Sequence, residues 1–338
     1  MYTDRQRFLD AINFKKPQDH LPKLEWAAWW DVTYNRFLAE GLPEGMNFNQ
    51  SLHYFGLEVM QGFGVPIFWT GAPQPDHRSG VIENEDDYHR IRDKVFCDEA
   101  IEATVNNVIK PLKEASDRGE VITRMCIDGF FWCPRTFFGI ENHLYSFYDY
   151  PELYHEICQD ALEFHIKSIE AVCQVLTPDM ACVSEDMSYN GGPMLSYDTY
   201  KEFVYPYYLK LFPVLKKHGI KIFIDSDGKL EGMIPWLIEA GAEGILPLER
   251  QAMVDVAFIR DNYPDFCMMG GFDKTVLQNG EAAIRAEFER LLPVMRKGGY
   301  VPTMDHQTPP DCSLENYKIY ARLYDEYTHR AVREWEGK

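Results

Sequence analysis

Short apolar runs alternate with longer amphipathic segments along most of the 338-residue chain. The runs read PKLEWAAWW, VITRMCIDGFFW, DMACVSEDM, IKIFIDSD, AEGILPLE, DFCMMGGFD and GYVPTMDH. The segments between them have helical periodicity; residues 151–176, for example, carry an apolar stripe through Leu153, Ile157, Leu162, Ile166, Ile169 and Val172. Strands that are each followed by a helix form parallel sheets, because the helical crossover returns the chain to the same edge.

The number of these units decides between two kinds of α/β fold. Seven or more units without a glycine-rich phosphate loop after the first strand favour a closed barrel over a doubly wound open sheet. We therefore predict a single (β/α)8 TIM barrel spanning residues 1–338. A helix at residues 4–13 is expected to precede the first strand, and residues 70–120 are expected to be an insertion or decoration.

The charge balance limits the classes of partner. The chain has 34 basic and 53 acidic residues, a formal net charge of −19. Nucleic acids and anionic membranes attract clusters of Lys and Arg, so we expect neither as a partner. Eight cysteines without a CxxC pair, and the lack of any apolar run of ~18 residues, predict a reduced, soluble, cytoplasmic protein. We expect a monomer or homodimer that binds a small molecule.

Acidic residues follow nearly every predicted strand. In a barrel of this type the chemistry sits at the C-terminal ends of the strands. The residues there are Glu25, Asp128, Glu185, Asp186, Asp225, Asp227, Glu249, Asp273, Asp305 and His306. A single acid after a strand is commonly a helix N-cap. Asp225 and Asp227 are more informative, because residues two apart in a strand point to the same side. His306 precedes a proline-stiffened loop, VPTMDHQTPPD.

Three tryptophans, Trp26, Trp29 and Trp30, follow Glu25 and predict an aromatic wall beside it, although core positions would explain them equally. The side chains expected to bind substrate are Glu25, Trp26, Trp30, Asp128, Tyr189 and Asp273. Paired carboxylates and abundant Trp are also compatible with glycoside hydrolysis, a weaker alternative. No nucleophile elbow, P-loop or HExxH motif occurs in the sequence.

Several long stretches resemble the uroporphyrinogen decarboxylase superfamily, which includes methyltransferases that exchange methyl groups with corrinoid proteins. The stretches are RQRFLDAINFKKPQDHLP, GFFWCPRTFFGIENHLYSFYDYPELYHEI, MLSYDTYKEFVYPYYLKLFPVLKKHG, GAEGILPLERQAMVDVAFIRDNYPDFCMMGGFDKTVL and GGYVPTMDHQTPPD. Together they cover nearly the whole chain. The resemblance implies an (α/β)8 barrel, in agreement with the pattern of strands and helices.

The decarboxylases of this superfamily carry an arginine-rich segment similar to MRQAGR after the first strand, which holds substrate carboxylates. Here that place reads EWAAWWDVTYNRF, with Glu25 and Asp31 instead. An acidic mouth is a poor host for a substrate with eight carboxylates, so we predict that uroporphyrinogen is a poor substrate. His306, in the context DHQTPPD, falls where the decarboxylases have a functional histidine.

The methyltransferases carry His-x-Cys-Gly after the sixth strand and a later Cys, which together bind zinc. Here Asp225, Ser226, Asp227 and Gly228 occupy the first place and His306 falls close to the second. The resemblance thus implies a site of Asp225, Asp227 and His306. Glu185, an acid at another strand end, is expected to be a further catalytic residue. Two carboxylates and an imidazole suit zinc, manganese or iron. The same residues would equally act as general acid and base without a metal.

The leading hypothesis is an enzyme that transfers a methyl group from a small O- or N-methylated compound to a corrinoid protein. The corrinoid would be carried by that partner, and no cofactor is expected to be covalently bound. One alternative is a decarboxylase acting on a tetrapyrrole such as uroporphyrinogen or on a smaller acid. Another is a catalytically inactive binding protein on the same fold.

Overall fold

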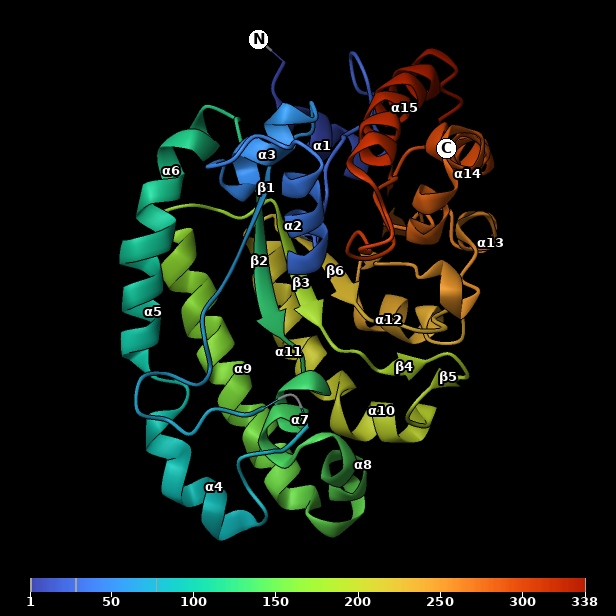
Figure 1. Ribbon diagram of the computed structural model, residues 1–338. Helices are drawn as coiled ribbons and strands as arrows, with labels where there is room; N and C mark the ends of the chain where they lie inside the picture. The colour runs from blue at the N-terminus through green and yellow to red at the C-terminus, as the bar shows by residue number, and fades with distance from the viewer. Residues whose placement is uncertain (1, 28, 77, 338) are drawn as a thin grey trace.

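The computed structural model describes residues 2–27, 29–76 and 78–337. Seven parallel strands form one curled sheet in the order β1-β2-β3-β6-β7-β8-β9, and each strand is followed by helices on its outer side (Figure 1). The strands are β1 (Met60–Gly64), β2 (Ile122–Asp128), β3 (Met180–Ser184), β6 (Lys221–Asp225), β7 (Gly244–Leu246), β8 (Cys267–Met269) and β9 (Tyr300–Val301). A small antiparallel hairpin is made by β4 (Ser188–Tyr189) and β5 (Gly192–Pro193).

The segment around Leu24 takes the eighth position in the wall. Leu24 forms a parallel bridge with Glu58, just before β1. On its other side, the Trp26 indole Nε1–H donates to the carbonyl oxygen of Met304, just after β9, at 3.0 Å. The predicted TIM-like barrel is therefore confirmed, with this first segment joined to its neighbours by single contacts rather than by a full ladder.

Alternate residues of the strands point inward and form an apolar core of their own. This inner core consists of Leu24, Met60, Ile122, Met180, Cys182, Phe223, Leu246, Cys267, Met269 and Val301. Phe8 and Ile12 of α1 (Asp4–Ile12) join this core and are fully buried. The helix begins at a capping box formed by Thr3 and Gln6, which satisfies the first backbone N–H groups. Helix α1 thus closes the N-terminal end of the barrel.

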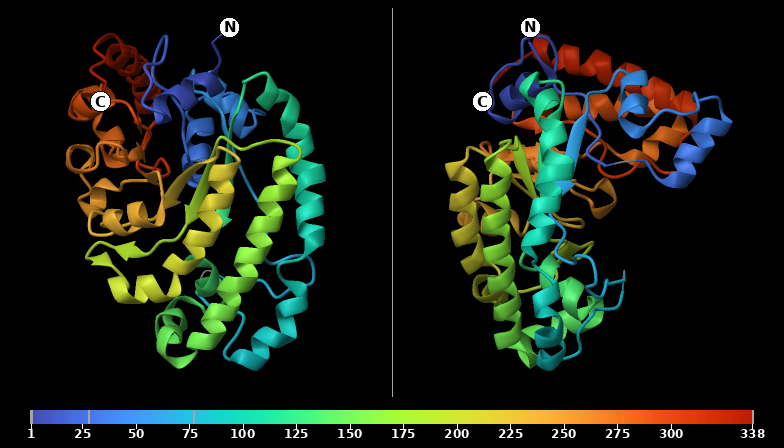
Figure 2. Two further views of the ribbon diagram at one scale, coloured as in Figure 1. Left: turned by 180° about the vertical axis from the view of Figure 1, so that it is seen from behind. Right: turned by 90° about the vertical axis from the view of Figure 1, so that its left-hand side faces the viewer.

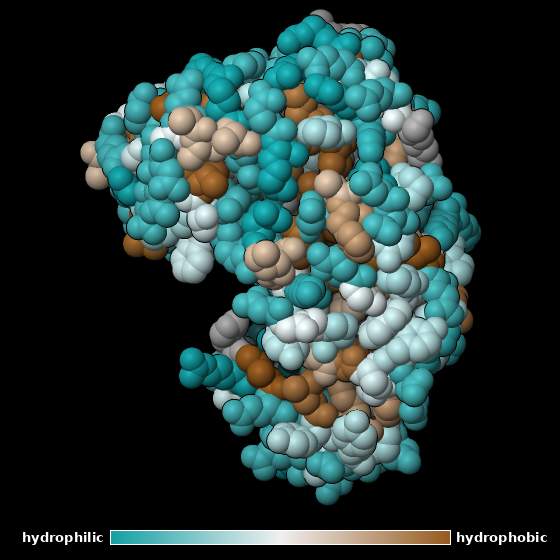
Figure 3. All heavy atoms as spheres, turned by 90° about the vertical axis from the view of Figure 1, so that its right-hand side faces the viewer, coloured by the Kyte–Doolittle hydropathy of each residue, from teal (hydrophilic) through white to brown (hydrophobic). Residues whose placement is uncertain are grey.

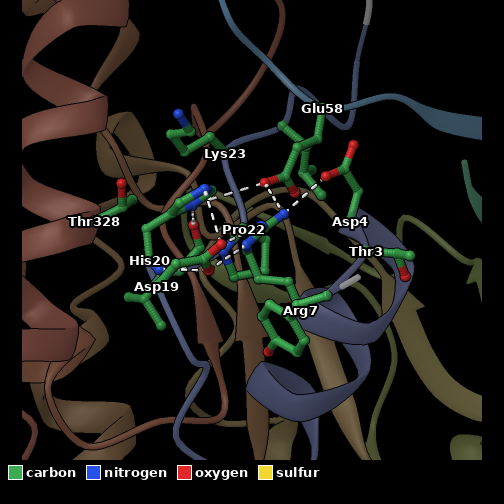
Figure 4. Close-up of polar contacts among 12 residues, drawn as sticks. Thr3, Asp4, Arg7, Asp19, His20, Pro22, Lys23, Glu58 and Thr328 are labelled. Atoms are coloured by element: carbon green, nitrogen blue, oxygen red, sulfur yellow. Dashed lines mark hydrogen bonds and ion pairs between the residues drawn. The ribbon is translucent and has the colours of Figure 1, made fainter. Parts of the chain in front are cut away.

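A buried arginine holds this helix in place (Figure 4). The Arg7 guanidinium is 5% exposed and donates to Asp4 at 2.8 Å and to Glu58 at 2.9 Å. It also forms two bonds with Asp19, at 2.8 and 2.6 Å. Because an unpaired charge is costly to bury, the three carboxylates make the burial of Arg7 possible. They connect α1 to the chain before β1 and to the loop that follows the helix.

The outer helices cover the sheet through a second, larger apolar core. Their bounds are α2 (Asp31–Ala39), α3 (Phe48–Tyr54), α4 (Glu85–Ile91), η1 (Arg92–Lys94), α5 (Asp98–Thr104), η2 (Val105–Ile109), α6 (Lys110–Asp117), α7 (Trp132–Phe138), α8 (Ile140–Asp149), α9 (Pro151–Cys173), α10 (Tyr197–Phe203), α11 (Tyr205–Lys217), α12 (Ile234–Ala240), η3 (Arg250–Ala252), α13 (Val256–Asn262), η4 (Lys274–Asn279), α14 (Glu281–Met295) and α15 (Leu314–Arg333). Among the described residues, no helix combines the length and apolar character needed to cross a membrane.

Residues 70–120, expected to be an insertion, have two parts. The helical stretch from α5 through η2 to α6 runs beside α9 and forms the crossover between β1 and β2 (Figure 1). The preceding part, with α4, is additional to a simple crossover. The N-terminal helix lies at Asp4–Ile12, close to the predicted 4–13.

Replacing Phe8 with Ala should lower the free energy of unfolding by about 3–5 kcal/mol, because the change leaves a cavity where α1 fills the barrel. Urea denaturation followed by circular dichroism measures this loss. Phe258 on α13 is 47% exposed, so Phe258→Ala is a matched control that should cost less than about 1 kcal/mol. Equal losses for the two variants would contradict the role of α1 as a buried plug.

Candidate active site

The C-terminal ends of the strands open into a hollow on one side of the molecule. In the right-hand view of Figure 2, α2 and α3 project on one side of this opening and the segment of α7 and α8 lies on the other. Figure 3 shows the hollow in the space-filling view, with an apolar band along its lower wall. Since α1 closes the opposite end, this is the open end of the barrel, where enzymes of this architecture carry their sites.

Three carboxylates, Asp186, Asp225 and Asp227, gather at this mouth. The Asp227 backbone N–H donates to Asp186 Oδ1 at 3.3 Å. Burial, and then the nearby charge of Asp186, raise the pKa of Asp225 to about 7. The same two causes, followed by the charge of Glu249, raise the pKa of Asp227 to about 8. Because the Asp227 side chain is 40% exposed, water screens part of this repulsion.

His306 faces this cluster. Its Nε2 lies 3.9 Å from Asp227 Oδ2. The Gln307 backbone N–H donates to its Nδ1 at 2.9 Å, so in the neutral ring the proton is on Nε2, toward Asp227. Burial, and then the charge of Lys274, lower the pKa of His306. The Trp26 ring meets His306 edge to face at 5.7 Å. Of the predicted site of Asp225, Asp227 and His306, this geometry places Asp227 and His306 side by side, and the catalytic role of the three residues stays a prediction.

Lys274, at the start of η4, balances part of the negative charge. Lys274 Nζ lies 3.3 Å from Glu249 Oε1 and 3.7 Å from Asp305 Oδ1. Asp305 is fully buried and also accepts from the backbone N–H groups of Arg250 and Lys274, at 3.0 and 3.2 Å. It therefore ties the loops after β7 and β8 together. Glu249 lies near the Gly228 N–H, 3.4 Å away, next to Asp227.

A pocket of about 250 Å³ adjoins the acids. It is lined by Phe131, Arg135, Ile140, His143, Leu144, Asp186, Ser188, Met194 and Asp227. Burial lowers the pKa of His143 to about 3, so this imidazole is neutral near pH 7. The pocket thus has one acidic end and an apolar wall contributed by α8 and the segments around it.

Deeper in the barrel, β2 presents Arg124, Cys126 and Asp128 on alternate positions of its inward face. The Arg124 guanidinium carbon lies 5.9 Å from the center of the Trp26 ring. Burial raises the pKa of Asp128 to about 6. Sequence reasoning missed Arg124 and Cys126 as site residues. An arginine inside the otherwise apolar run VITRMCID was the signal that could have identified them.

A metal ion needs several donor atoms close together, so the positions of the His, Cys, Asp and Glu donors bear on the predicted metal site. In the described part of the chain, the triad Glu85, His89 and Glu156 has its donor atoms within 4.8 Å of one another, but it lies on α4 and α9 at the surface. His89 and Glu156 already pair there at 3.0 Å. Within the same described residues, Asp225, Asp227 and His306 do not form such a triad in this arrangement. We therefore derive no step through a metal, and binding of zinc, manganese or iron stays a prediction.

Glu185, predicted to be catalytic, lies behind the mouth rather than in it. It is fully buried and accepts from the backbone N–H groups of Phe130, Phe131 and Trp132, at 2.9, 2.8 and 3.0 Å. The Tyr208 hydroxyl donates to it as well. These bonds hold the turn between β2 and α7, so the structure gives Glu185 a supporting position. A carboxylate that follows a strand can be catalytic or can accept hydrogen bonds from backbone N–H groups, and the local sequence is the same in both cases.

Glu25 and Trp29 point into the barrel wall and the outer layer, whereas Trp30 is exposed at the start of α2 and its predicted contact with substrate stays a prediction. Glu25 is 4% exposed and accepts from Thr303 Oγ1 at 3.0 Å and from Tyr317 OH at 3.4 Å, between the barrel wall and α15. Burial raises its pKa to about 7. Trp29 is buried in an outer cluster of rings formed with Tyr34, Phe37, Phe48, Phe55 and Tyr317. Trp30 is 49% exposed where α2 begins. Among the three tryptophans predicted to form an aromatic wall, Trp26 places its ring against His306.

The two remaining substrate-binding predictions fall on the rim. Tyr189 of β4 is 58% exposed, and its carbonyl oxygen accepts from the Lys229 N–H at 3.0 Å, which supports the loop after Asp227. Asp273 caps η4 by accepting from the Thr275 N–H at 2.9 Å. No hydrogen bond or ion pair among the described residues joins Tyr189 or Asp273 to the acid cluster at the mouth.

Comparisons with known proteins agree with this architecture. The structure resembles a methyltransferase from Methanosarcina mazei with a TM-score of 0.62 over 97% of this chain and 99% of that chain, at 15% identity. It also aligns with a putative vitamin-B12-independent methionine synthase from Listeria monocytogenes, at 12% identity and a TM-score of 0.48, over 94% and 98% of the two chains. A search of curated proteins finds no match. Residues 57–327 match the sequence profile of the uroporphyrinogen decarboxylase (URO-D) family, to which the chain therefore belongs.

Proposed function

We propose that the protein is an enzyme that transfers a methyl group from a small O- or N-methylated compound to the cobalt of a corrinoid protein. The observation that carries the proposal is the cluster of Asp186, Asp225 and Asp227 with His306, next to a pocket with an apolar wall. Burial, and then the charge of Asp186, raise the pKa values of Asp225 and Asp227, which retains protons on these two carboxyl groups near pH 7.

Such a cluster supplies what removal of a methyl group requires. When the methyl carbon moves to the acceptor, the electron pair of the broken C–O or C–N bond stays on the oxygen or nitrogen. A carboxyl proton delivered to that atom yields a neutral alcohol or amine and leaves a carboxylate. The His306 Nε2 proton faces Asp227, so the imidazole is placed to stabilise the carboxylate. The corrinoid supplies the nucleophile for this chemistry.

The pocket supports the proposal in a second way. Phe131, Ile140, Leu144 and Met194 form apolar surface beside Asp227. Such a wall favours a methyl-bearing group over water, which would otherwise compete for the proton donor. The likeness to the Methanosarcina mazei methyltransferase is at the level of the fold, so the choice of methyl transfer rests on the cluster and the pocket.

A decarboxylase acting on a small acid is the second candidate. One observation favours it: the Arg124 guanidinium, inside the barrel, has two buried nitrogens without a hydrogen-bond partner. A substrate carboxylate would satisfy them. The strand end near Glu25 and Asp31 has no arginine until Arg36, so a substrate with eight carboxylates remains a poor fit.

Methyl transfer can be measured with reduced cobalamin as acceptor and a panel of small methoxy and methylamino compounds. We expect a shift of the visible band with at least one compound, and a rate about 100–1,000-fold lower for Asp227→Asn, which cannot donate the proton. Asp149→Asn, an exposed position on α8, is the control and should keep the wild-type rate. Release of carbon dioxide from small acids without any methyl transfer would reject this function in favour of the second candidate.

The rate of the methyl-transfer step should fall as pH rises. The donor, Asp227, must be protonated; burial, and then the charge of Asp186, raise its pKa to about 8 and the pKa of the deeper Asp225 to about 7, so the acid forms are present below these values and lost above them. Single-turnover rates between about pH 6 and pH 9 would show the decline. A rate that increases through this range would contradict a carboxyl group as the donor.

A further inference from the structure

Arg124, which is partly buried, differs from the buried arginines Arg7 and Arg260. Arg7 pairs with three carboxylates, and Arg260 donates to carbonyl oxygens of the surrounding loops at 2.7–3.2 Å. The Nε and Nη1 atoms of Arg124 are shielded from solvent and have no hydrogen-bond partner. Asp225 is near enough for Arg124 to act on its pKa, yet no described ion pair within 4.0 Å involves Arg124. A guanidinium with shielded nitrogens that make no hydrogen bond opposes folding.

The surrounding strands make room for this guanidinium. Gly62 of β1 is in register with Arg124 of β2. A Cβ at Gly62 would lie 3.1 Å from Arg124 Nη2 and 3.3 Å from Nε, so the missing side chain provides the space in which the guanidinium lies. Trp26 borders it on another side, 5.9 Å from its ring center. The inner apolar core fills the barrel on the N-terminal side of Arg124, so the guanidinium does not extend toward that end.

We propose that Arg124 is the recognition residue for a carboxylate group of the substrate, which therefore is a small organic acid. Arginine has planar donors that match the two oxygens of a carboxylate. The group must carry little charge to pass the acids at the mouth, which favours a carboxylate over a phosphate. The transferred methyl group would then lie nearer the opening, beside Asp227.

Burial raises the pKa of Asp128 to about 6 and contributes to the raised pKa of Asp225, so the acids on the way to Arg124 carry less negative charge than their number suggests. The inference adopts the site of the proposed function but not its chemistry, because a decarboxylase would bind its acid in the same way. Binding is therefore tested without a corrinoid and without turnover. A negative result for carboxylate binding and a negative result for methyl transfer can then be distinguished.

Calorimetric binding of matched acids and amides tests the assignment. The probes are methoxyacetate with methoxyacetamide, and 4-methoxybenzoate with 4-methoxybenzamide. The wild-type protein should bind at least one acid about tenfold or more tightly than its amide, and Arg124→Gln should remove that preference while leaving amide binding unchanged. Equal affinity for acid and amide, a preference that persists in Arg124→Gln, or no binding of either acid at millimolar concentration would overturn the proposal.

Melting temperatures distinguish recognition from a structural role. Without ligand, Arg124→Gln should melt at or above the wild-type temperature, because it removes a charged group with two shielded nitrogens that lack hydrogen bonds. Arg260→Gln should melt several degrees lower, since it breaks bonds that the fold uses. A similar drop for Arg124→Gln would show that the arginine serves the fold and would overturn the proposal.

Gly62→Ala, which displaces the guanidinium, should weaken acid binding several-fold and leave amide binding unchanged.

Discussion

The closure of the barrel at one end determines where the charges of this protein lie. Phe8 and Ile12 of α1 fill the N-terminal end together with the inward residues of the strands. Apolar side chains fill the inward positions near this end, and Asp128 and Asp225 end β2 and β6 at the other end. Arg7 and its carboxylates keep α1 seated. The raised pKa values at the mouth follow from this arrangement, because partly buried acids lie close together there.

Much of the fold followed from the pattern of apolar runs. Six of the seven expected runs contain β2, β3 and β6–β9, and the first contains the bridge at Leu24. β1, with the sequence MQGFG, was not recognised, because its glycines give no alternating apolar signal. Those glycines face neighbours that need the space: a Cβ on Gly62 would approach Arg124, and one on Gly64 would approach the Cys126 carbonyl.

The site was predicted in part, and for a physical reason. Asp225, Asp227 and His306 could be placed at the mouth because strand ends of a barrel meet there. Glu25 and Glu185 also end strands, but their carboxylates turn into the wall, where Thr303 and the backbone before α7 supply donors. These side-chain orientations depend on tertiary contacts, which cannot be read from the local sequence. The sequence alone equally could not show that two guanidinium nitrogens of Arg124 lack a hydrogen-bond partner.

The central claim is that the carboxyl cluster at the mouth keeps a proton near neutral pH. Infrared difference spectroscopy during a pH titration measures this directly, since a protonated carboxyl group absorbs apart from carboxylates. We predict a carboxyl band that persists to about pH 7 and is diminished in Asp225→Asn. If the band of the wild-type protein is gone by about pH 5, or is unchanged in that variant, the cluster does not hold the proton and the account of its chemistry is contradicted.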